Sequence, residues 1–172
     1  RAMVQHLYNC PCIAMWVPFN EGWGQFDAAR AVGVIHEIDT SRTVDHASGW
    51  HDQGIGETKS LHVYFRPYVF KPDRRGRAVI LTEFGGYNCL VPGHSFNDRD
   101  FGYKRLGDAD KLRAALEELY SQQIAPAYEQ GLAAAIYTQV SDVEDELNGL
   151  ITYDRQVVKI PPETVRNIVK VD

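Results

Sequence analysis

Trp16-Val-Pro-Phe-Asn-Glu-Gly-Trp-Gly24 begins as an apolar run and ends abruptly in polar and aromatic residues. This pattern is typical of a strand that presents an acid, here Glu21, at its end. A second stretch, Ala78-Val-Ile-Leu-Thr-Glu-Phe-Gly-Gly86, places Glu83 in the same way after an apolar run. Two glutamates at strand ends suggest hydrolysis of glycosides, in which one carboxyl group acts as acid and base and the other as nucleophile.

The composition predicts one domain over residues 1–172. The chain has 172 residues, of which 44% are hydrophobic and 24% charged, so it can bury one sizeable core but not two comfortable domains. The net charge of -5 and the scattered Lys and Arg residues argue against nucleic acid as a partner.

The sequence shows no membrane or targeting signal. No apolar run approaches the roughly 18 to 20 residues that span a bilayer, and no basic stretch precedes an apolar one at the N-terminus. The compartment is therefore not predicted. The odd cysteine count, with cysteines at positions 10, 12 and 89, favours reduced, buried thiols over a disulfide framework.

Hydrophobic periodicity predicts strands at 12–17, at 43–48, at 61–65, from residue 78 up to Glu83, and at 132–140. The first lacks alternation, as in a parallel strand that is buried on both faces. Helices are expected at 1–9, ending at Asn9, and at 26–38, where one face carries Phe26, Ala29, Val32, Ile35 and Ile38. Asp108 is expected to cap a helix that Pro126 splits before Gly131, and a closing helix runs from Pro161 to Lys170.

Alternating strands and helices predict an α/β fold. A (β/α)8 barrel takes about 250 residues, or about 31 per unit, so five units need on the order of 155. The sequence therefore predicts a partial TIM barrel of about five βα units. Residues 85–107 are predicted to form a long loop that covers a site.

The two glutamate motifs resemble strands four and seven of family 2 glycoside hydrolases, the family of β-galactosidases and β-glucuronidases. His62-Val-Tyr64 resembles strand six of that family, and Tyr137 to Arg155 resembles strand eight and its loop. The resemblance implies the C-terminal part of the catalytic barrel, strands four to eight. It implies Glu21 as acid/base, Glu83 as nucleophile, Asn20 as a ligand of the sugar 2-hydroxyl and Tyr64 as a hydrogen-bond partner of Glu83.

Further sugar contacts are expected from Trp23, Trp50 and Tyr87, whose flat apolar faces can pack on a sugar ring, and from His62 and Tyr137. Ordinary packing explains a tryptophan equally well at Trp50 and better at Trp16. No metal or cofactor is expected: Cys10-Pro-Cys12 is too tight for a zinc ribbon, and the histidines form no metal-binding motif. The acidic run from Asp142 to Glu146 lacks the ligand spacing of a calcium loop and is expected to be a solvated loop.

The sequence thus predicts the catalytic part of a retaining β-glycosidase that acts on a carbohydrate by double displacement. Its N-terminal barrel strands and β-sandwich domains are expected to precede Arg1, so the isolated chain should be weak or inactive, and its exposed strand edges should favour homo-oligomers. Two other classes stay open: a noncatalytic carbohydrate-binding or structural barrel fragment, and a metal-dependent barrel hydrolase. The Asn-x-Lys motif of the glucuronidases does not occur, which favours a neutral sugar such as galactose.

Overall fold

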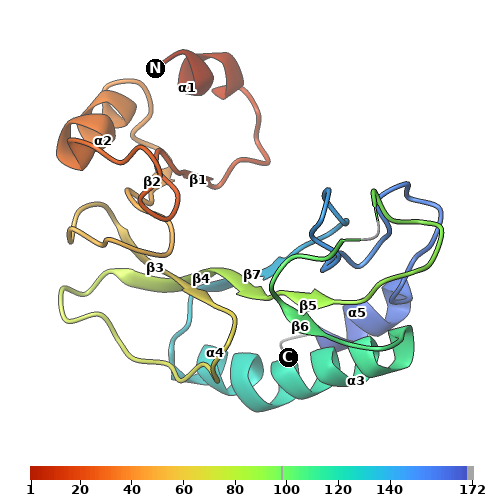
Figure 1. The fold of residues 1–172 in the computed structure, drawn as a ribbon. Coiled ribbons are helices and arrows are strands. Elements are labelled where there is room, and N and C mark those ends of the chain that lie inside the picture. Colours follow the sequence, from red (N-terminus) through yellow and green to blue (C-terminus); the bar gives the residue numbers. More distant parts are fainter. Residues whose placement is uncertain (98, 170–172) are drawn as a thin grey trace. The chain divides into compact units, whose positions relative to one another are not determined.

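The computed structural model describes residues 1–97 and 99–169. The chain forms two compact units, and each is described by itself. The first unit comprises Arg1–His62, Lys71–Thr82 and Leu132–Ala134; the second comprises Val63–Phe70, Glu83–Gly131 and the chain from Ala135 onward. Figure 1 labels their helices and strands.

The first unit begins with α1 (Ala2–Leu7), β1 (Met15–Trp16), α2 (Ala28–His36) and β2 (Thr43–Val44). β1 and β2 pair in parallel through Met15 with Thr43 and Trp16 with Val44. The predicted βα unit is therefore confirmed. Its core consists of buried apolar side chains from all four elements, namely Val4, Trp16, Val32, Ile35 and Val44.

Trp16 packs in this core, as predicted, and its polar atom is also satisfied. Its indole Nε1 donates to Asp39 Oδ2 at 2.8 Å, and the Arg42 guanidinium binds the same carboxylate at 2.6 Å. The hydrogen bond from Ser41 and those from Arg42 and Trp16 hold the pKa of Asp39 well below its ordinary value. Asp39 is thus an ionised, buried anchor that ties α2 to β1.

Three strands form one sheet in the order β3-β4-β7: β3 (Thr58–Val63), β4 (Ala78–Gly85) and β7 (Ala134–Thr138). The division between the units cuts each of these strands, at residues 62, 82 and 134. All three were predicted from the sequence, β4 over nearly its whole length.

The second unit adds β5 (Tyr87–Asn88), β6 (Lys104–Arg105) and α3 (Ala109–Leu119). The π-helix η1 (Tyr120–Ile124), α4 (Ala125–Gln130) and α5 (Pro162–Ile168) follow. β5 and β6 pair in parallel, and α5 packs on α3 (Figure 1). The buried core of this unit contains Cys89, Leu112, Leu116 and Ile160.

The predicted helix start after Asp108 and the predicted helix end before Gly131 are confirmed, whereas the end of α3 at Leu119 and the π-helix were not predicted. The Asp108 carboxylate accepts from the Lys111 amide at 2.8 Å and so caps the start of α3. Pro126 lies in the first turn of α4, after the π-helix, where a proline costs no hydrogen bond. Gly131 ends α4 with φ 114°, in the left-handed region.

Several sequence predictions were wrong in detail. β1 is two residues long and only half-buried at Met15, and α2 begins after Phe26, whose side chain is 72% exposed. The last helical residue of α1 is followed by Tyr8 as its cap, so Asn9 does not cap it. Residues 85–107 contain β5 and β6, and Cys12 is exposed. The predicted helix end at Lys170 lies outside the described residues.

The acidic run from Asp142 to Glu146 is not simply a solvated loop. Asp142 is buried, and its Oδ1 receives hydrogen bonds from the Gly149 amide and from Lys159 Nζ, both within 2.8 Å. Lys159 Nζ also donates to the Leu147 carbonyl at 2.9 Å. Burial raises the pKa of Asp142, and the Lys159 ammonium opposes that shift. The pair ties loop 141–149 to the segment before α5.

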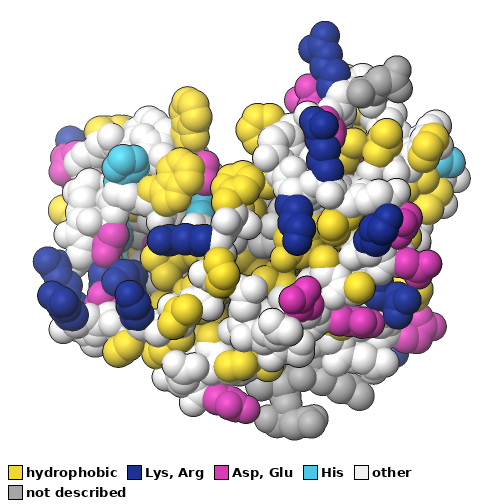
Figure 2. Space-filling model, turned by 60° about the horizontal axis from the view of Figure 1, so that its bottom comes forward, with side chains coloured by type: hydrophobic (Ala, Val, Ile, Leu, Met, Phe, Trp, Pro, Cys, Tyr) yellow, Lys and Arg dark blue, Asp and Glu magenta, His cyan; other side chains and the backbone are white. Residues whose placement is uncertain are grey.

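Large hydrophobic side chains remain exposed in both units, including Trp23, Phe26, Phe65 and Phe101. Figure 2 shows hydrophobic side chains at the surface among Lys, Arg, Asp and Glu side chains. None of the helices in the described part of the chain is long and apolar enough to cross a membrane. The described sheets have two, three and two strands, so the partial TIM barrel stays a prediction.

Candidate functional site

In the first unit, Glu21 lies in a hydrogen-bonded cluster with His62, Ser48 and Thr82, which is called the Glu21 cluster below. His62 Nδ1 lies 2.7 Å from Glu21 Oε1, and its Nε2 lies 3.0 Å from Ser48 Oγ. Ser48 Oγ donates to Thr82 Oγ1 at 2.9 Å. His62 is buried and both of its ring nitrogens are engaged, so the imidazole has one fixed orientation beside the carboxyl group.

The hydrogen bonds of the Glu21 cluster limit where its protons can lie. Because the Ser48 hydroxyl donates to Thr82, it accepts from His62 Nε2, which therefore carries a hydrogen. The short contact between His62 Nδ1 and Glu21 then needs one further proton. Either Glu21 is protonated and His62 is neutral, or Glu21 is ionised and His62 is cationic. The pair can therefore supply a proton to a substrate and recover it.

Backbone conformation places Glu21 at this point. Glu21 has φ 51°, which is uncommon for a residue other than glycine and is concentrated at functional sites. Its amide donates to the Ser48 carbonyl at 3.0 Å, and Asn20 forms a parallel bridge with Ser48. The loops after β1 and β2 are thus joined directly beside the acid.

Gly49 allows the close approach of His62. A Cβ on Gly49 would lie 2.3 Å from His62 Cγ, so no larger residue fits without a shift. The ring of Trp50 lies 6.2 Å from that of His62 and is half exposed. Trp50 can therefore present one face to a ligand beside the Glu21 cluster.

In the second unit, Glu83 lies with Tyr64 and Thr138 in what is called the Glu83 cluster below. The Tyr64 hydroxyl donates to Glu83 Oε2 and also lies 3.2 Å from Thr138 Oγ1. Burial and then the bond to Glu83 raise the pKa of Tyr64 well above its ordinary value, so the phenol stays protonated and donates. The three residues come from β4, from the chain after β3 and from the end of β7.

Aromatic side chains surround Tyr64. Its ring lies 5.1 Å from that of Tyr103, which stacks on Phe65 at 6.3 Å and meets Phe101 edge-on at 5.7 Å. Gly86 makes this packing possible, because a Cβ there would lie within 3 Å of both tyrosine rings. Phe65 and Phe101 are largely exposed and so offer apolar surface to a ligand.

The other predicted sugar contacts lie in different settings. Asn20 and Trp23 are exposed on the turn that carries Glu21, and they form an antiparallel bridge with each other. Tyr137 instead packs edge-to-face on Phe84, and its hydroxyl donates to the Asn148 carbonyl at 3.4 Å. The contacts of Tyr137 are thus internal to the second unit, and its role in sugar binding stays a prediction.

Sequence reasoning missed Ser48, Thr82, Thr138 and the aromatic partners of Tyr64. Ser48 ends the predicted strand 43–48, and Thr138 lies near the end of the predicted strand 132–140. Their positions were therefore the available signal that hydroxyl groups lie at these strand ends. Tyr103 lies in the segment that was predicted to cover a site. Nothing in the sequence indicated that Thr82, next to Glu83, bonds to Ser48.

Glu21 and His62 are also side chains of the types that bind metals. A catalytic zinc ion usually takes three protein ligands. Within the first unit, these two already use their facing atoms on each other.

A search of protein-family models finds no family that matches this chain, and a search of curated proteins finds no match either.

Proposed function

We propose that the chain is the catalytic part of a retaining β-glycosidase, similar to family 2, with Glu83 as nucleophile and Glu21 as acid/base. The observation that carries the proposal is the Glu83 cluster. In it a glutamate on a strand accepts a hydrogen bond from the Tyr64 phenol, which keeps its proton because its pKa is raised. Barrel enzymes gather catalytic residues from the ends of several strands, as both clusters do.

The reaction has two displacement steps. The Glu83 carboxylate attacks the anomeric carbon, the glycosidic C–O bond breaks, and Glu21 protonates the departing oxygen. Glu21, now ionised, then takes a proton from water, which attacks the same carbon and releases Glu83. The Tyr64 hydrogen bond orients one oxygen of Glu83 so that the other can attack.

Covalent labelling tests the proposal in a single turnover, so it does not require an efficient enzyme. A fluorinated galactoside with a dinitrophenolate leaving group traps the glycosyl-enzyme. Peptide mass spectrometry should find the sugar on Glu83, and Glu83→Gln should abolish labelling. Glu129→Gln, at an exposed position of helix α4, is the matched control and should label like the wild type. Labelling of another residue, or of the Glu83→Gln variant, would overturn the assignment.

The exposed Trp23 and Trp50 favour one second candidate, a noncatalytic carbohydrate-binding module. That function predicts sugar binding that Trp23→Ala weakens and that Glu83→Gln leaves unchanged, with no covalent label. Titration calorimetry with galactosides, run beside the labelling, separates the two.

A further inference from the structure

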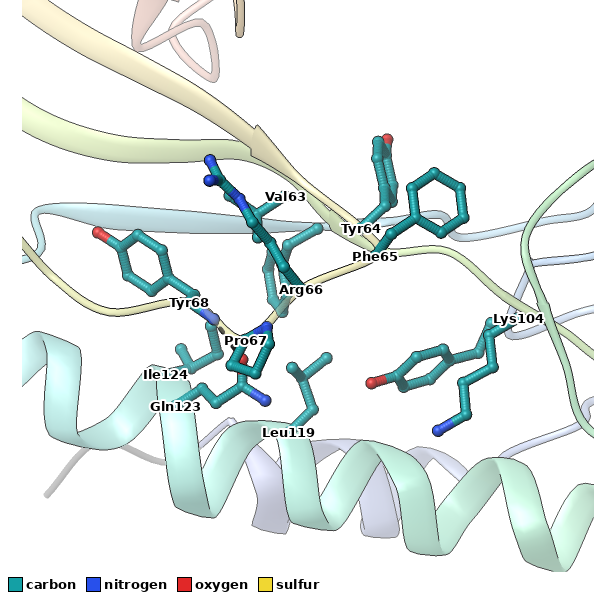
Figure 3. Close-up of a pocket in the computed structure, with 12 residues that line it drawn as sticks. Val63, Tyr64, Phe65, Arg66, Pro67, Tyr68, Lys104, Leu119, Gln123 and Ile124 are labelled. Carbon is teal, nitrogen blue, oxygen red and sulfur yellow. Dashed lines mark hydrogen bonds between the residues drawn. The ribbon is translucent and has the colours of Figure 1, made fainter.

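The second unit contains a cavity of about 390 Å³ whose lining includes Tyr64 of the Glu83 cluster but neither of the two proposed catalytic glutamates. This volume lies within the range of small-molecule sites, about 300 to 1,000 Å³. Figure 3 shows side chains that line it, from the segment after β3, from β6 and from the end of α3 and the π-helix.

The cavity lies on the face of β4 opposite Glu83. Phe84 lines it, and successive side chains of a strand point to opposite faces. In Figure 3 the Tyr64 hydroxyl, the group that binds Glu83, points away from Leu119 and Gln123. A ligand in the cavity would therefore not compete with a sugar at Glu83.

Apolar walls and hydrogen-bond donors combine in this cavity. Pro67, Leu119 and Ile124 provide apolar wall. Gln123 Oε1 accepts from the Tyr68 amide at 2.7 Å, which leaves the side-chain NH₂ group of Gln123 to donate to a ligand. In Figure 3 this nitrogen points toward Leu119.

Two cations add positive charge. Lys104 and Arg66 are exposed at the cavity, and no carboxylate among the described residues forms an ion pair with either. The Lys104 ammonium lies 5.5 Å from the centre of the Tyr87 ring. Burial, with a smaller effect of the Glu118 carboxylate, raises the pKa of Tyr87, so its hydroxyl is available as a donor.

The helix at the cavity is irregular in a way that supports a binding role. Gln123 and Ile124 come from the π-helix, and π-turns occur frequently at functional sites. Tyr68, which also lines the cavity, is buried, and its hydroxyl has no hydrogen-bond partner within the described part of the chain.

We propose that this cavity binds a small organic anion with an apolar body, such as an aromatic carboxylate or phosphate ester, independently of the glycosidase chemistry. The apolar walls cover the body of the ligand, Lys104 and Gln123 meet its anionic group, and Arg66 adds positive charge at the rim. Cations that lie beside apolar walls and have no carboxylate partner are complementary to an organic anion with an apolar body. They are not complementary to a neutral sugar.

Benzoate, phenyl phosphate and neutral benzyl alcohol serve as probes in an NMR titration of backbone amides. Benzoate or phenyl phosphate should shift the signals of residues that line the cavity, and benzyl alcohol should bind more weakly. Lys104→Met should weaken binding of the anions about tenfold, since a hydrogen bond to a charged group is lost. Arg113→Met, which removes an exposed cation of α3 outside the cavity, is the charge-matched control.

The outcomes separate this site from the proposed function. Glu83→Gln should leave anion binding unchanged even if labelling shows that the chain is no glycosidase. The proposal is overturned if no lining residue shifts up to about 10 mM probe, a range that reaches even very weak binding. Equal weakening by Arg113→Met, or equal affinity for benzyl alcohol, would also overturn it.

Discussion

At the scale of single residues, the Glu21 cluster gives His62 a positioning role that can be measured. Both ring nitrogens of this histidine are bonded, one to the acid and one to Ser48. In the proposed reaction it would therefore hold the carboxyl group of Glu21 and share its proton without needing to touch the sugar.

We predict that His62→Gln slows labelling by a fluorinated glycoside with a phenolate leaving group about 10- to 100-fold, because positioned proton transfer contributes in that range or above. With a dinitrophenolate leaving group, which departs without protonation, labelling should slow only slightly. Ser48→Ala should give a smaller loss of the same kind. The ratio of the two labelling rates is the measurement, and equal losses with both leaving groups would contradict the role.

A second residue-scale prediction concerns acid stability. Hydrogen bonds from Arg77 lower the pKa of Asp52 to about 2, below its ordinary value. A lowered folded-state pKa means that the stabilisation is present above the unfolded pKa of about 4 and is lost as the pH falls toward about 2. The free energy of unfolding in urea should therefore fall across this window. The difference between wild type and Asp52→Asn should shrink there, and a difference that stays constant from pH 6 to about 2 would rule out this linkage.

At the scale of elements, the start of α3 and the end of α4 were the most predictable features. Asp108, Pro126 and Gly131 act through local backbone chemistry, so their effects can be deduced from neighbours in the sequence. The limits of β1 and the exposure of Phe26 could not be deduced, because they depend on which distant side chains pack there. The same reason explains Asp142, whose burial depends on Lys159, seventeen positions further along the chain.

We predict that Asp108→Ala lowers the free energy of unfolding by about 1 kcal/mol, the usual effect of losing a helix N-cap. Asp110→Ala is the matched control within the same turn, since that carboxylate is exposed and pairs with the Arg113 side chain. Urea unfolding of both variants is the measurement. An Asp110→Ala variant that loses as much as Asp108→Ala would show that general charge effects, and not the cap, account for the loss.

At the scale of the whole molecule, the sequence pattern indicated strands, helices and two glutamates, but it contained no signal for two compact units. Each unit is assembled from three separate stretches of the chain. Such an assembly depends on long-range contacts, and periodicity reports only the local structure of a segment. Glu21 belongs to the first unit and Glu83 to the second, so the motifs alone could not show which side chains each glutamate meets.

The proposed function requires Glu21 and Glu83 to act on one glycosidic bond, which raises the question of whether one copy of the chain supplies both. In a barrel the strands follow one another in sequence, so their ends gather at one face within a single chain. We therefore predict that mixing Glu21→Gln with Glu83→Gln restores no labelling by the phenolate glycoside. If sites instead formed between exchanging copies of a symmetric dimer, up to about a quarter of the sites would recover both carboxyl groups. Peptide mass spectrometry of the segment that carries Glu83 distinguishes these results, with wild type mixed separately with each variant to show that the copies do not inhibit one another.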